Sequence, residues 1–123
     1  MTTPQNRRAH SRYKLPVGYV PVEVRIPGRR GRLEGHAYDI SQGGLRFEID
    51  EPLPPGTRVT IELKLPKSRR GDRIRAIADV VWVGDVEDPA PYKMAARFAE
   101  FINERDASTL AANLDAGRFS HAA

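Results

Sequence analysis

Apolar and polar residues alternate along most of this chain, and this alternation is the feature that most limits the folds open to it. Residues 20–26 and 59–65 show it most clearly, with Val, Ile or Leu at every second position. A period of two places such residues on one face of a β-strand. Gly- and Pro-containing segments that favour turns separate the runs. The sequence therefore predicts a mainly β protein.

Six segments are predicted strands, at residues 20–26, 33–40, 45–49, 59–65, 73–83 and 92–98. Pro21 marks the first as an edge or bulged strand, because Pro cannot donate a ladder hydrogen bond. Six short strands separated by turns predict a closed antiparallel β-barrel over residues 15–102, since closure removes exposed edges. Phe47, Trp82 and Phe98 fall at positions expected to belong to the core or to line the barrel.

The end of the chain has a different periodicity. Ala107, Leu110, Ala111 and Leu114 recur near helical spacing, and Gly117 is a plausible stop signal. We therefore predict a C-terminal α-helix over residues 103–117 that covers a barrel mouth or packs on the sheet. The length of 123 residues suits one domain with one core.

Composition and motifs favour a cytoplasmic protein that is not an enzyme. The chain has no cysteine, which excludes disulfides and thiolate metal sites and agrees with a reducing compartment. No apolar run approaches membrane-spanning length, so membrane insertion is not expected. His10, His36 and His121 are dispersed, without the clustered spacing of zinc sites. We predict no catalytic residues, no metal and no cofactor.

The N-terminal segment, residues 1–14, is predicted to be a flexible tail and concentrates positive charge. Arg7, Arg8, Arg12 and Lys14 occur there without an acidic residue, and these four bases equal the formal net charge of +4, so the rest of the chain is balanced. Concentrated like charge attracts anions. The alternative is a solvated leader without a ligand.

A second motif, Asp39-Ile40-Ser41-Gln42-Gly43-Gly44, lies at a predicted strand end. The Asp39 carboxylate can accept two hydrogen bonds, which matches the paired N–H donors of guanine, and Ser41 supplies a hydroxyl. Gly44 permits positive φ or a close backbone approach. Arginine can bond guanine in a bidentate manner or grip phosphate. The motif is equally good chemistry for an ordinary turn.

The two motifs, in this order and followed by a β-rich body, resemble the PilZ domain family of bacterial cyclic di-GMP receptors. The resemblance also includes Val80-Val81-Trp82 and Ala96-Arg97-Phe98, where the family usually has Gly in place of Ala96. It implies that Arg8, Arg12, Asp39, Ser41 and Gly44 contact cyclic di-GMP. An arginine at position 7 resembles members that bind two intercalated ligand molecules, which adds Arg7 to the expected contacts.

The resemblance implies a receptor or adaptor that changes the conformation of its tail and its surface on binding cyclic di-GMP and so regulates a downstream effector protein. Motility, biofilm or exopolysaccharide production are the expected outputs. One alternative is a small basic barrel that binds RNA or single-stranded DNA through its basic loops, although such sites need aromatic platforms. A PilZ-like protein-interaction module without a ligand is the other.

Overall fold

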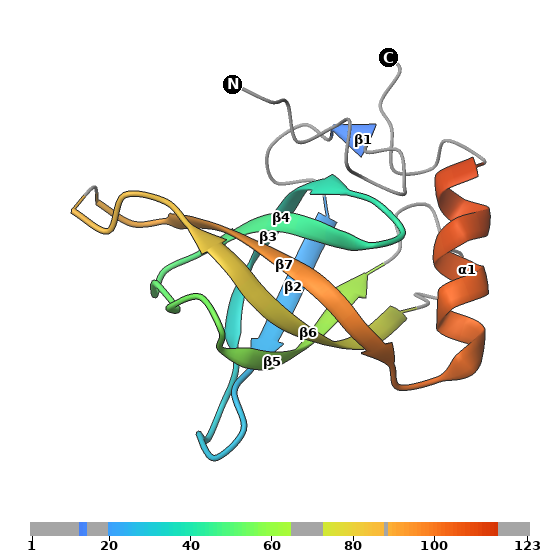
Figure 1. Ribbon diagram of the computed structural model, residues 1–123, viewed down its shortest axis with the longest axis horizontal. Coiled ribbons are helices and arrows are strands. Elements are labelled where there is room, and N and C mark those ends of the chain that lie inside the picture. Colours follow the sequence, from blue (N-terminus) through green and yellow to red (C-terminus); the bar gives the residue numbers. More distant parts are fainter. Residues whose placement is uncertain (1–12, 15–19, 65–72, 88, 116–123) are drawn as a thin grey trace.

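The computed structural model of the chain describes residues 13–14, 20–64, 73–87 and 89–115. Seven strands and one helix follow one another along the chain (Figure 1). They are β1 (Tyr13–Lys14), β2 (Val20–Arg25), β3 (Leu33–Ile40), β4 (Gly44–Ile49), β5 (Arg58–Lys64), β6 (Arg73–Val83), β7 (Tyr92–Phe101) and α1 (Glu104–Asp115). The six predicted strands and the predicted helix are confirmed, with small shifts at their ends.

Six of the strands close into an antiparallel barrel in the order β3-β2-β5-β6-β7-β4, because β4 also pairs with β3. The predicted six-stranded antiparallel barrel is therefore confirmed. The short strand β1 is an addition to it, and it pairs with the end of β3. The β3–β4 ladder has a β-bulge at Ala37/Asp39 in β3. The β6–β7 ladder has a β-bulge at Val80/Trp82 in β6 and a further register shift at Ile77/Ala78. A bulge reverses which face the following residues occupy, because it adds one residue to one strand.

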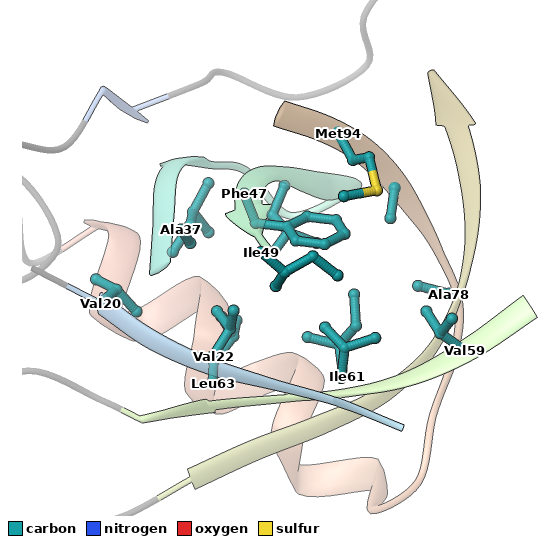
Figure 2. Close-up of a cluster of buried hydrophobic side chains, with 14 of the residues drawn as sticks. Val20, Val22, Ala37, Phe47, Ile49, Val59, Ile61, Leu63, Ala78 and Met94 are labelled. Carbon is teal, nitrogen blue, oxygen red and sulfur yellow. The ribbon is translucent and has the colours of Figure 1, made fainter. Parts of the chain in front are cut away.

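The barrel interior is filled by the alternating apolar residues that predicted the strands (Figure 2). Phe47 from β4, Ile61 and Leu63 from β5 and Met94 from β7 are fully buried and converge there. Leu110 and Leu114 of α1 belong to the same cluster. The core thus includes one face of the helix, as expected for a helix that packs on the barrel.

The helix α1 begins with an N-cap and is attached to β6. The Asn103 side chain accepts a hydrogen bond from the Arg105 amide at 3.1 Å, the usual capping interaction. One turn later, the Asp106 carboxylate accepts a hydrogen bond from the Arg75 amide at 3.0 Å. These bonds hold α1 beside the end of the barrel where β7 ends and β6 begins (Figure 1).

Two details of the sequence analysis were wrong. Strand β2 is not an edge, because it lies between β3 and β5. Pro21 is tolerated there since pairing with β5 starts only at Val22. Trp82 is not in the core but 47% exposed, whereas Phe47 is buried and Phe98 is partly buried against the core. The bulge at Val80/Trp82 is the reason, because it turns Trp82 to the outer face.

Candidate functional site

The Asp39-to-Gly44 motif forms the connection from β3 to β4. The Ser41 amide donates to the Gly44 carbonyl at 2.9 Å, and the Ser41 hydroxyl donates to the same carbonyl at 3.3 Å. The Gly43 amide donates to Ser41 Oγ at 3.2 Å. The Gly43 carbonyl accepts from the Phe98 amide at 2.9 Å, which ties the turn to β7. The Ser41 side chain therefore stabilises the turn from within, and the Gly43 carbonyl attaches the turn to β7.

Gly44 is required by a close backbone approach. A Cβ atom at this position would lie 2.2 Å from the carbonyl oxygen of Ala96 on β7. Its φ is not in the left-handed region, which among the described glycines is occupied by Gly28, Gly31 and Gly56. Of the two roles that the sequence offered for Gly44, the structure therefore supports the close approach. Ala96 is 3% exposed, so its methyl group belongs to the core and not to the outer face.

Asp39 occupies the outer side of the barrel although little of it is accessible. Its neighbour Ile40 is fully buried, and Asp39 is 7% exposed. The bulge at Ala37/Asp39 sets Asp39 opposite Arg46 of β4, and Arg46 alternates with the buried Leu45 and Phe47. Asp39 and Arg46 consequently lie side by side on the outer face of the β3–β4 ladder.

The strand β1 brings the end of the basic tail to the Asp39 motif. Tyr13 is the ladder partner of Ile40, and Lys14 is the partner of Asp39. Arg7, Arg8 and Arg12 lie outside the described residues, and the structure does not place them. Arg12 is nevertheless bonded to Tyr13. The two motifs that are about thirty residues apart in sequence are therefore connected by one strand pairing.

Four residues beside the turn, Arg46, Trp82, Ala95 and Arg97, were not identified by the sequence analysis as site residues. In three successive ladders, outward-facing residues are paired with one another and form a row across the barrel. The row consists of Asp39, Arg46, Ala95 and Trp82. Arg97 lies next to this row, opposite Gly44. The alternation of β4 indicated that Arg46 points outward, but the register between β4 and β7 cannot be derived from the sequence. Trp82 and Asp39 each follow a bulge.

Three arginines far from the turn, Arg29, Arg32 and Arg73, form ion pairs with carboxylates. Arg29 Nη2 donates to Glu51 Oε1 at 2.9 Å, and this bond lowers the pKa of Glu51. Arg32 lies 3.3 Å from Glu23, and Arg73 lies 2.8 Å from Glu62. Arg32 and Arg73 thus give no free basic surface for a nucleic acid, whereas the residues between Lys64 and Arg73 lie outside the described part.

A surface pocket of about 190 Å³ lies away from the Asp39 turn. It is on the outer side of β2, β3 and β5, and its lining contains Glu23, Glu34 and Glu62. Glu23 is the ladder partner of both other glutamates. These glutamates form ion pairs with Arg32 and Arg73, and the pocket contains none of the residues of the two motifs.

The described residues contain no group of three His, Cys, Asp or Glu side chains able to hold a metal ion. Within the same part of the chain, α1 is too short and too polar to cross a bilayer. His36 is exposed on β3, as expected for a surface residue.

Comparison with protein-family models identifies one family. Residues 6–116 match the model of the PilZ domain. Among solved structures, the chain is similar to the Bacillus subtilis inhibitor of motility MotI/DgrA, with a TM-score of 0.67 and 18% identity over 89% of this chain and 51% of that chain. It is also similar to the PilZ domain of Escherichia coli YcgR with c-di-GMP, with a TM-score of 0.63 and 17% identity over 91% of this chain and 98% of that chain.

A longer YcgR structure in complex with c-di-GMP gives a TM-score of 0.64 and 20% identity over 89% of this chain and 46% of that chain. The chain thus spans about half the length of MotI/DgrA and of this longer YcgR. At these identities the similarity shows a shared fold. A comparison with curated protein sequences finds no match.

Proposed function

The chain belongs to the PilZ domain family, and we propose on this premise that it is a receptor for cyclic di-GMP. PilZ domain proteins are typically receptors without enzymatic activity. One observation supports the proposal most strongly. The ladder pair Lys14 and Asp39 leads the tail directly to the turn that carries the second motif. With this pairing, Arg8 is six residues from Lys14, a distance of at most about 22 Å along an extended chain.

In the proposed complex, the tail contacts one part of the ligand and the turn contacts another. Asp39 accepts two hydrogen bonds from the Watson–Crick edge of a guanine, as its paired oxygens allow. Arg8 and Arg12 bind phosphate or the opposite edge of the base through their planar guanidinium groups. Ser41 shapes the turn from within and Gly44 allows it to approach β7, so that the ligand meets a preformed backbone.

Arg7 is proposed to favour a second ligand molecule. Two molecules of cyclic di-GMP bring four negative charges, and a third guanidinium can stack on a purine while it offsets part of that charge. The stoichiometry of a calorimetric titration tests this role. We expect two molecules per wild-type chain and one per Arg7→Ala chain. One molecule per wild-type chain contradicts it.

We further propose that the tail closes over the ligand and so changes the surface that an effector protein meets in the cytoplasm. Ordering costs about 1–2 kcal/mol per backbone residue, which charge-assisted bonds to the ligand must offset. Two of the similar structures were solved with c-di-GMP, and a third is of an inhibitor of motility. Amide exchange of residues 1–12 should slow on ligand addition. Equal exchange in both states contradicts the closure.

Calorimetric titration of the full chain with cyclic di-GMP tests the receptor function. We expect binding by the wild type and a loss of about tenfold or more for each of Arg8→Ala and Asp39→Ala, since a hydrogen bond to a charged group contributes about 1.5–3 kcal/mol. GTP is the control ligand, and Glu34→Ala, in the acidic pocket, is the control variant. A folded wild type that binds no cyclic di-GMP contradicts the proposal. Binding of a single-stranded nucleic acid that Asp39→Ala leaves unchanged favours the alternative barrel function.

A further inference from the structure

Four residues of β4 and β7 form a distinct patch on the outer face beside the turn. Gly44 is in register with Arg97, and Arg46 is in register with Ala95. The residues between them, Leu45 and Ala96, are 0% and 3% exposed, so the four share the opposite, outer face. The arginines therefore occupy one diagonal of the patch, and the two smallest residues occupy the other.

The second diagonal of the patch carries no long side chain, and Gly44 itself is buried. Gly44 has no side chain and Ala95 has only a methyl group, so nothing on the second diagonal rises between the guanidinium groups. Diagonal neighbours on antiparallel strands are about 7–8 Å apart, which is within reach of long side chains. Trp82, in register with Ala95 and 47% exposed, borders the patch on the β6 side.

The two arginines carry charge that is not neutralised by an ion pair. Among the described residues, neither Arg46 nor Arg97 has a carboxylate within ion-pair distance. Asp79 is in register with Arg97, but Arg58 binds both of its oxygens at 2.8 and 3.0 Å. Two cations at neighbouring positions on one sheet face repel each other. An anion bound between them would remove that repulsion.

We propose that Arg46 and Arg97 form a phosphate-binding subsite that takes one phosphodiester of cyclic di-GMP. This inference rests on the proposed receptor function and extends it to residues outside the two motifs. The patch includes Gly44, where the turn ends, so a ligand whose guanine meets Asp39 carries a phosphate toward β7. The guanidinium fork binds phosphate in a bidentate manner, and two forks on one patch can hold it from two sides.

Calorimetric titration of the full chain at two salt concentrations tests the subsite. The test variant is Arg46→Gln/Arg97→Gln, and the control is Arg25→Gln. Arg25 is exposed on β2, on the far side of the barrel, and also has no ion pair among the described residues. We expect the test variant to bind about tenfold or more weakly and to lose part of the salt dependence, because charge-assisted bonds are removed. The control should bind as the wild type does.

A second variant, Ala95→Glu, keeps both arginines but places a longer side chain between them and offers them a carboxylate. We expect it to weaken binding to a similar extent with unchanged thermal unfolding, because Ala95 lies on the outer face. Wild-type affinity in both the double variant and Ala95→Glu overturns the subsite but leaves the receptor function intact. Equal weakening by Arg25→Gln overturns it as well, since net charge alone would then explain the loss. A folded wild type that binds no cyclic di-GMP rejects both proposals.

Discussion

Lys14 and Asp39 are direct partners in the ladder between β1 and β3. This pair joins the last residue of the basic tail to the first residue of the Asp39 motif. Tyr13, the preceding residue, pairs with Ile40, and in an antiparallel ladder the next step leads toward Ser41. The N-terminal end of β1 therefore points toward the turn between β3 and β4 and away from the pocket at the opposite end of β3.

If this backbone pairing positions the tail, Lys14→Pro should weaken the binding of cyclic di-GMP more than Lys14→Ala does. Proline removes the amide donor and fixes φ, whereas alanine removes the same charge but keeps the backbone able to pair. Calorimetric titration of both variants measures the difference. Equal affinity of the two variants would show that only the charge of Lys14 matters.

Gly44→Ala should disturb both the fold and ligand binding. The added methyl group would lie 2.2 Å from the Ala96 carbonyl oxygen, so β4 and β7 must separate where the turn is fixed. Gly35→Ala is the matched control, because its Cβ would lie 1.9 Å from the Glu48 carbonyl oxygen, far from the turn. We expect both to lower the urea midpoint of unfolding, and Gly44→Ala alone to weaken binding by the molecules that remain folded. The same loss of affinity in both would contradict a local role.

Phe47 and Trp82 should differ strongly in their effect on stability. Phe47→Ala removes a fully buried ring and should lower the free energy of unfolding by about 3–5 kcal/mol. Trp82→Ala removes a side chain that is 47% exposed, so its cost should be about 1 kcal/mol or less. Urea unfolding followed by far-UV circular dichroism measures both. A cost for Trp82→Ala near that of Phe47→Ala would mean that the indole belongs to the core.

The Arg58–Asp79 pair predicts a pH dependence on the acidic side. The hydrogen bond from Arg58 lowers the pKa of Asp79 below its ordinary value of 3.8. A lowered pKa means that the folded state favours the carboxylate, so this contribution is present above pH 3.8 and is lost as the pH falls through the lower folded value. The effect should be small, because the pair is exposed to solvent. Asp79→Asn should flatten the decline of the urea midpoint between pH 5 and about pH 2.5, and an unchanged decline would contradict this assignment.

The strands and the barrel could be predicted because alternation records which face each residue occupies. Phe47 and the apolar residues of β5 follow this rule without interruption. Trp82 does not, since the bulge in β6 shifts its parity and moves it from the expected core position to the outer face. No residue type in Val80-Val81-Trp82 indicates a bulge, so the outward position of Trp82 could not be predicted from the sequence.

In the candidate site, too, some features depend on neighbouring residues and could be predicted, whereas others depend on the pairing of distant strands and could not. The turn chemistry of Ser41 and Gly44 is local, and the sequence indicated it. The approach of Gly44 to β7 and the placement of Arg97 beside it depend on the register of strands that are distant in sequence. Both bulges turn a residue, Asp39 in β3 and Trp82 in β6, onto the same outer row. That row exists only in the closed barrel.

The most direct test of the central claim is to map amide chemical shifts of the labelled full chain during titration with cyclic di-GMP. The measurement locates the ligand without a substitution that could disturb the fold. We predict the largest shifts at Lys14, Asp39, Ser41 and Gly44, with little change at Glu23 and Glu62 of the acidic pocket. Shifts confined to the acidic pocket, or no shifts at saturating ligand, would contradict a receptor built on the Asp39 turn and the basic tail.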